Sequence, residues 1–186
     1  KQIRMEFLHE GMETLPVWID RQQFDKVLIN LMSNAVKYTP AGGNVKVTLT
    51  TDDSTSPSTL TLTIFDSGEK IPEESLTRIF ERFYQAPTAS AQYKTGTGVG
   101  LDLTRSLVLL HHGDITARNT DEGVEFIVTL PLGKDHLSQE EIATWDEEGN
   151  TPETLQSEME AQEDDTQPSA QSLQAAATSG SKKATA

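Results

Sequence analysis

The sequence predicts an α+β fold, a two-layer α/β sandwich in which helices cover one face of a mixed β-sheet. Alternating apolar and polar residues predict the strands, because every second side chain of a half-buried strand faces the core. Apolar residues spaced three and four apart predict the helices. The predicted elements are, in order, strands 3–7 and 17–19, helix 20–39, strands 45–50 and 60–65, helix 72–85, a helix that opens at Gly96–Leu101 and runs through His112, and hairpin strands 115–117 and 124–130.

Composition divides the 186 residues into a folded domain, 1–134, and an acidic low-complexity tail, 135–186. The tail carries −10 of the net charge of −14 and has few large apolar residues, so we expect a disordered linker. The chain has no cysteine, which excludes disulfides and cysteine-based metal sites. Neither part has the basic patch of a nucleic-acid binder, and no apolar run approaches the roughly 20 residues of a membrane span.

The helix predicted at 20–39 is the most informative element. Asp20 is a good N-cap with Gln23 three residues on, and Pro40 should end the helix. Beside the apolar face, Asn30, Asn34 and Lys37 follow one another at helical spacing. Two amides near a core cost free energy unless they find partners. This polar stripe is either a solvated helix edge or part of a binding site.

The later elements contribute further expectations. The helix at 72–85 should bury Ile79, Phe80 and Phe83, and residues 86–97, nearly free of large apolar groups, should form a mobile lid. Gly113 should occupy the left-handed position after the helix that ends at 112. A short helix is expected at 138–145 in the tail.

Two more polar features follow the stripe in the chain. Asp66-Ser67-Gly68 ends a strand, where a carboxylate can face a ligand and a glycine allows close approach. Gly96, Gly98 and Gly100 open a helix, whose free N–H groups favour phosphate. Each feature alone is common in turns. Together with the amide stripe they indicate a site for a magnesium nucleotide.

The sequence resembles the ATP-binding catalytic domain of sensor histidine kinases, a member of the HATPase (GHKL) family with the Bergerat ATP-binding fold. Asn30-Leu-Met-Ser-Asn34-Ala-Val-Lys37-Tyr38-Thr resembles the asparagine box of that family, and Phe65-Asp66-Ser67-Gly68 the first glycine box. Ile79-Phe80-Glu81-Arg82-Phe83-Tyr84 resembles the phenylalanine box, and Gly96–Leu101 the second glycine box. The resemblance covers about residues 1–134.

The resemblance implies roles for individual residues in binding Mg-ATP. Asn34 would coordinate Mg²⁺ with support from Asn30, Lys37 would contact phosphate, and these three would be the catalytic residues. Tyr38 would lie along the adenine, and Asp66 would accept a hydrogen bond from its amine. The other residues implied at the nucleotide are Gly68, Ile71, Phe80, Phe83, Gly96, Thr97, Gly98, Val99, Gly100 and Leu101, with Phe80 and Phe83 as lid anchors or plain core residues. Arg82 could reach the γ-phosphate.

One departure leaves other functions open. The family's first glycine box usually has a second glycine where this chain has Lys70, a change that could narrow the adenine pocket. A degenerate module used for docking without catalysis is therefore one alternative. A gyrase-type ATPase is another, although the position before Asn34 holds Ser33, which cannot act as a general base.

The resemblance also implies a larger parent protein. The domain would pass the γ-phosphoryl group to a histidine on a separate dimerisation and phosphoacceptor domain, since none of His9, His111, His112 and His136 is a convincing acceptor. The segment from Leu130 to Ile142 resembles hybrid two-component sensors of Bacteroidetes, where a receiver domain of a response regulator follows. The parent would be a dimeric membrane sensor with this part, itself monomeric and without membrane contact, on the cytoplasmic side.

Overall fold

The computed structural model of the chain describes residues 1–9, 15, 17–54, 56–87 and 97–144. By internal contacts the chain divides into one unit, Lys1–Ala143, and a second, Thr144–Ala186, of which only Thr144 is described. The first unit contains every strand found among the described residues, and it contains the site discussed below.

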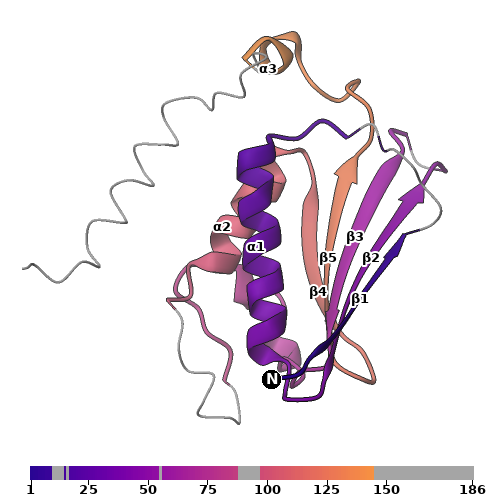
Figure 1. Cartoon of the computed structure of the whole chain (residues 1–186). Coiled ribbons are helices and arrows are strands. Elements are labelled where there is room, and N and C mark those ends of the chain that lie inside the picture. The colour runs from indigo at the N-terminus through magenta and orange to yellow at the C-terminus, as the bar shows by residue number, and fades with distance from the viewer. Residues whose placement is uncertain (10–14, 16, 55, 88–96, 145–186) are drawn as a thin grey trace, which may run out of the picture. The chain divides into compact units, whose positions relative to one another are not determined.

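The described part of the first unit is built on a five-stranded sheet with the order β1-β2-β3-β5-β4. The strands are β1 (Arg4–His9), β2 (Asn44–Asp52), β3 (Thr59–Asp66), β4 (Asp114–Asn119) and β5 (Val124–Pro131). β1 pairs in parallel with β2, and the other neighbours are antiparallel. The sheet is therefore mixed, as predicted (Figure 1).

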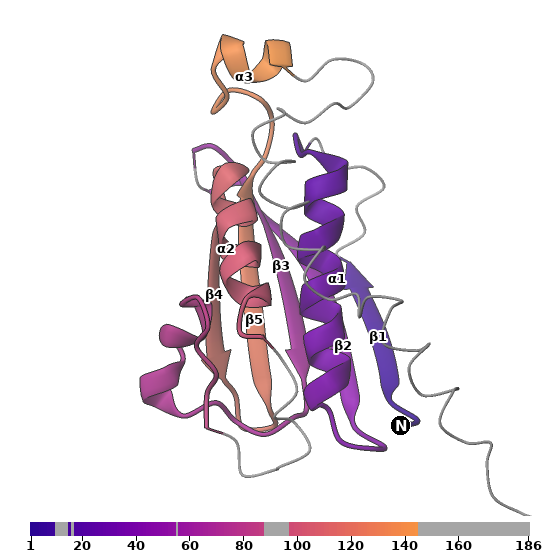
Figure 2. The same cartoon turned by 90° about the vertical axis from the view of Figure 1, so that its left-hand side faces the viewer.

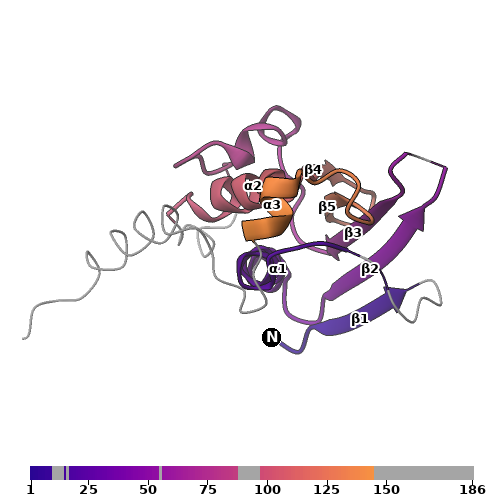
Figure 3. The same cartoon turned by 90° about the horizontal axis from the view of Figure 1, so that it is seen from above.

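Two helices, α1 (Arg21–Tyr38) and α2 (Gly100–Leu110), pack against each other on one face of the sheet. Figures 2 and 3 show both helices on the same side of the strands. α1 begins as predicted, since the Asp20 carboxylate accepts a hydrogen bond of 3.0 Å from the Gln23 backbone N–H. Thr39 ends α1 in an extended conformation just before Pro40. The two-layer α+β sandwich is confirmed.

The core lies between these two layers. Its most buried side chains come from one face of α1, one stripe of α2 and alternate positions of β3 and β5. These residues include Val27, Leu31, Ala35, Ile64, Val108 and Val128, all fully buried. The apolar core fills the space between the helices and the middle of the sheet. A pocket can therefore form only at the ends of the strands and helices, where polar residues lie.

The first predicted strand exists, but it is not half-buried. Met5 is 57% exposed and Phe7 59% exposed, although both face the same side of the sheet as buried Val45. β1 is one of the two edge strands, and α1 packs on β3 instead of covering β1. The strand predicted at 17–19 is reduced to a single bridge between Val17 and Gly133.

The helix predicted at 72–85 is wrong. Two short 3₁₀ turns, η1 (Glu73–Ser75) and η2 (Arg78–Phe80), replace it, and the chain becomes extended at Glu81. The Phe83 N–H donates a hydrogen bond of 2.9 Å to the Gly98 carbonyl, a pairing that a continuous helix would prevent. This tertiary contact overrides the helical spacing of the apolar residues.

The end of α2 differs from the prediction by one residue. His112, with φ of 58°, occupies the left-handed position that we expected for Gly113. The N–H groups of His112 and Gly113 donate to the carbonyls of Leu109 and Val108, which is a Schellman motif. Gly113 is needed for a different reason, because a side chain there would collide with the Thr129 carbonyl.

The short helix expected in the tail is present as α3 (Gln139–Thr144). Ser138 and Glu141 form a reciprocal capping box, and Glu141 also contacts His112 at 2.6 Å. Residues 135–143, which we placed in the tail, therefore belong to the first compact unit. Residues 145–186 lie outside the described residues, so their lack of structure stays a prediction.

Candidate functional site

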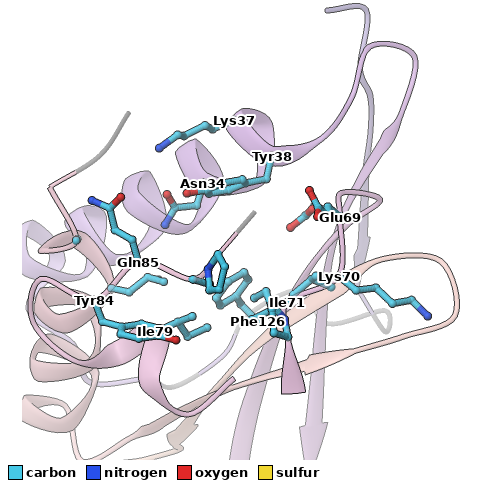
Figure 4. Close-up of a pocket in the computed structure, with 18 of the residues that line it drawn as sticks. Asn34, Lys37, Tyr38, Glu69, Lys70, Ile71, Ile79, Tyr84, Gln85 and Phe126 are labelled. Carbon is cyan, nitrogen blue, oxygen red and sulfur yellow. The ribbon is translucent and has the colours of Figure 1, made fainter. Parts of the chain in front are cut away.

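A cavity of about 710 Å³ lies at the C-terminal ends of α1 and β3 and at the N-terminal ends of β5 and α2. In Figure 4, Asn34, Lys37 and Tyr38 project from α1 on one side, and Ile79 and Tyr84 face them from the other. The lining residues are Asn30, Asn34, Lys37, Tyr38, Asp66, Glu69, Lys70, Ile71, Pro72, Ile79, Tyr84, Gln85, Ala86, Pro87, Thr97, Gly98, Gly100, Leu101, Val124 and Phe126.

One end of the cavity combines a buried carboxylate with apolar walls. Asp66, the last residue of β3, is only 3% exposed. Burial raises the pKa of Asp66 to about 6, although a hydrogen bond from the Gly68 N–H favours the ionised form. Ile71, Val124 and Phe126 line the same cavity. Such a pocket suits a flat, mostly apolar ligand that donates one hydrogen bond.

The loop after β3 explains the need for Gly68. A side chain at this position would come within 2.5 Å of Asp66 Oδ1 and 2.9 Å of the Tyr38 carbonyl oxygen. Gly68 itself does not line the cavity, so its contribution is to let α1 approach the carboxylate.

Lys70 stands where the related motif has glycine, and the structure shows no strain there. Among the described residues, Lys70 is not one of the non-glycine positions with positive φ. Its side chain is exposed and runs away from Tyr38 and Ile79 (Figure 4). Lys70 therefore lines the cavity without a side chain that crosses it.

At the other end of the cavity, Asn30 joins α1 to the start of α2. Its side-chain amide donates a hydrogen bond of 2.7 Å to the Thr104 hydroxyl, which in turn donates to the Gly100 carbonyl at 2.9 Å. A side chain at residue 100 would lie 2.5 Å from Asn30 Oδ1. The glycine is thus required for this close packing of the two helices.

Lys37 and Asn34 complete the polar end. The Lys37 ammonium lies 5.0 Å from the centre of the Tyr38 ring, close enough for a cation–π interaction. Asn34 lies one turn earlier on the same side of α1 (Figure 4). This end therefore combines the Lys37 ammonium, the Asn34 side-chain amide that lines the cavity, and the first N–H groups of α2. Such a combination is suited to phosphate oxygens.

The segment before α2 is held to the turn that contains Phe83. Gly98 has φ of 71°, and a side chain there would lie 2.8 Å from the Phe83 carbonyl carbon. Phe83 itself has φ of 65° and is 68% exposed. Residues 88–96, between these two points, are outside the described residues, and with them Gly96 and most of the expected lid.

Most of the predicted site residues come together in the cavity. Those that line it are Asn30, Asn34, Lys37, Tyr38, Asp66, Ile71, Thr97, Gly98, Gly100 and Leu101. Those that do not are Gly68, Phe80, Phe83 and Val99. Phe80 is a core residue in edge-to-face contact with Phe126, whereas Phe83 is exposed, so the two do not share one role.

Several lining or supporting residues were not predicted as site residues from the sequence. Ile79, Val124 and Phe126 follow ordinary core patterns, and only their position at the ends of elements brings them to the cavity. Thr104 is 1% exposed and bonds to Asn30, yet a threonine inside an apolar helix gives no hint of this. Tyr84, whose hydroxyl pairs with Ser75 at 2.8 Å, could have been found as an aromatic beside a loop.

The described residues contain no cluster of three or more His, Asp or Glu side chains suited to a metal ion. A hard cation at Asn34 would need its other oxygen ligands from a bound phosphate and water. Mg²⁺ commonly binds in this way, with few protein ligands. The donor set therefore fits a metal that arrives with a nucleotide.

Comparison with known proteins identifies the family to which the chain belongs. A family model described as "Histidine kinase-, DNA gyrase B-, and HSP90-like ATPase" matches residues 19–134. Histidine kinase P4 of Formosa agariphila is 37% identical over 134 residues, covering 70% of this chain and 10% of that protein. Sensor histidine kinase WalK of Bacillus subtilis is 34% identical over 149 residues, covering 79% and 23%.

A solved structure agrees with these relatives. The mycobacterial sensor histidine kinase MprB superposes with a TM-score of 0.62 at 29% identity, covering 70% of this chain and 84% of that one. The chain belongs to the HATPase family, as an ATP-binding catalytic domain of the sensor histidine kinase type.

The chain spans about a tenth to a quarter of the length of these curated relatives. Within the described residues, no helix is both long enough and apolar enough to cross a membrane.

Proposed function

We propose that the cavity binds Mg-ATP and that the domain donates the γ-phosphoryl group to a histidine on the dimerisation and phosphoacceptor domain of its parent kinase. The observation that carries this proposal is that Asn34, Asp66 and Gly98, from three separate motifs, line one cavity. Phosphoryl transfer depends mainly on positioning and charge neutralisation, so a protein that supplies these needs little covalent chemistry.

The base of the nucleotide occupies the apolar end. Asp66 accepts a hydrogen bond from the exocyclic amine of adenine, which guanine lacks at that position. Ile71 and Tyr38 line the space beside the ring. The carboxylate has one oxygen engaged by the Gly68 N–H at 2.9 Å, which orients it from behind and leaves the other oxygen for the ligand.

The phosphates occupy the polar end. Asn34 would hold the magnesium ion, and Lys37 and the N–H groups around Gly98 and Gly100 would bind phosphate oxygens. The metal ion supplies neutralisation of phosphate charge when it is bound. The hydrogen bond between Asn30 and Thr104 fixes the distance between α1 and the start of α2, and with it the space for the phosphates.

Neither alternative has an observation in its favour. Ser33, the residue before Asn34, is exposed on α1 and has no carboxylate to activate water, which disfavours a gyrase-type ATPase. Lys70 was the main reason to consider a degenerate module, and its side chain leaves the cavity open (Figure 4).

The partners follow from the same proposal. A crystal structure of histidine kinase ThkA in complex with response regulator protein TrrA, with a TM-score of 0.58 at 30% identity, shows one neighbour bound to a regulator. We propose a response-regulator receiver domain as the second partner of the parent, in cis if the parent is a hybrid sensor of the Bacteroidetes type. Residues 145–186 would then be a linker, and the whole region would lie in the cytoplasm of a dimeric membrane sensor.

A phosphotransfer assay tests the proposed function. The chain is mixed with Mg²⁺, γ-labelled ATP and the purified phosphoacceptor domain of the parent, and acid-labile label on the acceptor is measured. We expect label only when both proteins are present, and its loss in Asn34→Ala. The control Asn44→Ala alters an exposed amide at the same end of the sheet, and it should label normally.

Rapid steady-state hydrolysis of ATP by the chain alone, surviving Ser33→Ala, would contradict the kinase assignment. It would place the domain with the ATPases of the same family instead.

A further inference from the structure

A single polar residue at the end of β4, Asn119, holds one wall of the cavity without lining it. Its Oδ1 accepts a hydrogen bond of 3.0 Å from the Ile71 N–H, and its Nδ2 donates one of 2.7 Å to the Ile71 carbonyl. Nδ2 also donates to Glu73 Oε1 at 2.9 Å. These bonds engage both hydrogens of the amide group.

The orientation of this amide is unambiguous. If the amide were flipped, its NH₂ group would face the Ile71 N–H, and its oxygen would face the Ile71 carbonyl and the Glu73 carboxylate. All three contacts would then be repulsive, whereas all three are favourable as placed. Asn119 therefore pairs with Ile71 as a neighbouring strand would, although Ile71 belongs to no strand.

The sheet places Asn119 in the same row as the carboxylate of the site. Asp66 on β3 pairs with Val124 on β5, and Val124 pairs with Asn119 on β4. Residues directly opposite one another point to the same face of a sheet. In this row, Asp66 and Val124 line the cavity. Asn119, the third residue of the row, contacts the loop that follows β3, at Ile71.

Hydrogen bonds also hold the start of that loop. Ser67 donates to the Asn44 carbonyl at 3.0 Å, and Gly68 donates to Asp66 at 2.9 Å. Glu69 and Lys70 are exposed. Pro72 has no N–H to donate. Further along the loop, Asn119 binds both the N–H and the carbonyl of Ile71 and so ties this residue to β4.

We propose that Asn119 is a positioning residue for the base end of the cavity, which sets the distance between Ile71 and the Asp66 carboxylate and thereby the affinity for adenine. The proposal rests on the proposed function, since it assumes that this end receives the base. Asn119 does not touch the nucleotide. Its loss should therefore weaken base binding and leave the phosphate end unchanged.

Competition binding separates the two ends. A fluorescent ATP analogue is displaced from the full chain, in Mg²⁺, by ATP and by inorganic tripolyphosphate, which lacks the base. For Asn119→Ala we expect ATP to bind about tenfold more weakly, and tripolyphosphate to bind within twofold of the wild-type value. Asn44→Ala, the amide control, should change neither affinity.

A second variant keeps the test informative if Asn119→Ala fails to fold. Asn119→Asp preserves size and the acceptor for the Ile71 N–H, but it cannot donate to the Ile71 carbonyl and places a charge beside Glu73. We expect it to weaken ATP binding at least threefold, again with tripolyphosphate unchanged.

Two results would overturn the inference. One is ATP affinity within twofold of wild type in a folded Asn119 variant. The other is an equal loss for ATP and tripolyphosphate, which would mean general destabilisation of the domain. If the wild-type chain itself shows no saturable binding of ATP, the proposed function fails, and this inference fails with it.

Discussion

The side-chain amide of Asn30 on α1 donates a 2.7 Å hydrogen bond to the hydroxyl of Thr104 on α2, and Thr104 is almost completely buried. This bond joins the helix that carries the amide stripe to the helix that begins at the glycine motif. It lowers the energetic cost of placing an asparagine beside an apolar face, because the side-chain amide donates to a buried partner.

Removing the Thr104 hydroxyl should destabilise the domain. Thr104→Val keeps the shape of the side chain but leaves the Asn30 amide without its partner, which should cost about 1–3 kcal/mol of unfolding free energy. Ser106→Ala is the matched control, because Ser106 also donates to a carbonyl four residues earlier but is exposed. Urea denaturation should show a change within about 0.5 kcal/mol for the control. Equal effects of the two changes would contradict this role of Thr104.

A methyl group at residue 100 should weaken nucleotide binding. Alanine normally favours a helix over glycine by about 1 kcal/mol, but here its Cβ would lie 2.5 Å from Asn30 Oδ1. Asn30 cannot move aside freely, since Thr104 holds its amide. We expect Gly100→Ala to weaken ATP binding about tenfold, measured by the displacement of a fluorescent analogue.

Gly42 provides the contrast to Gly100. It has φ of 78° with open space around it, so Gly42→Ala introduces backbone strain but no collision. This variant should lose about 1 kcal/mol of stability and keep its affinity for ATP. If Gly100→Ala also keeps its affinity, the packing of Gly100 against Asn30 does not matter for the site.

The two phenylalanines of the 79–84 motif should behave differently. Phe80 is 5% exposed and packs on Phe126, so Phe80→Ala should cost about 3–5 kcal/mol of unfolding free energy. Phe83 is 68% exposed, so Phe83→Ala should cost less than about 0.5 kcal/mol. Thermal and urea unfolding of the two variants measure this difference. Similar losses would mean that Phe83 is covered in solution.

These residues also show how far the sequence leads. The five strands of the sheet and both long helices could be predicted, because their apolar residues recur at the spacing of a strand or a helix. The meeting of the three polar motifs could be predicted as well, because each stands at the end or the beginning of such an element. The segment 72–85 could not, because Ile79 and Phe80 are buried equally well by a 3₁₀ turn, and the choice depends on the distant bond from Phe83 to Gly98. Thr104 and Asn119 are single polar residues whose partners lie on other elements, and local sequence carries no trace of such pairs.

The Asp66 carboxyl should make stability depend on pH. Burial raises the pKa of Asp66 in the folded chain to about 6, above its ordinary value of 3.8. The folded state therefore binds more protons than the unfolded state between these two pKa values. The protonated Asp66 carboxyl favours the folded state, so the contribution of Asp66 to stability is complete below about pH 4 and is lost as pH rises through about 6. At pH 7.5, Asp66→Asn should be more stable than wild type by about 1–3 kcal/mol, with the difference disappearing near pH 4.

Urea denaturation across this pH range measures the effect of Asp66→Asn. Asp53→Asn, a change at an exposed aspartate, is the control. A loss of stability at pH 7.5 in Asp66→Asn would contradict the assignment, since it would mean that the charged form is favoured by the fold.

Titration of the chain with a fluorescent ATP analogue, with and without Mg²⁺, shows whether the cavity binds a magnesium nucleotide. We predict saturable, Mg²⁺-dependent binding that unlabelled ATP displaces, and a loss of about tenfold or more in Asp66→Asn although that variant remains folded. Absence of saturable binding, or binding that Asp66→Asn leaves unchanged, would show that this cavity is not a nucleotide site.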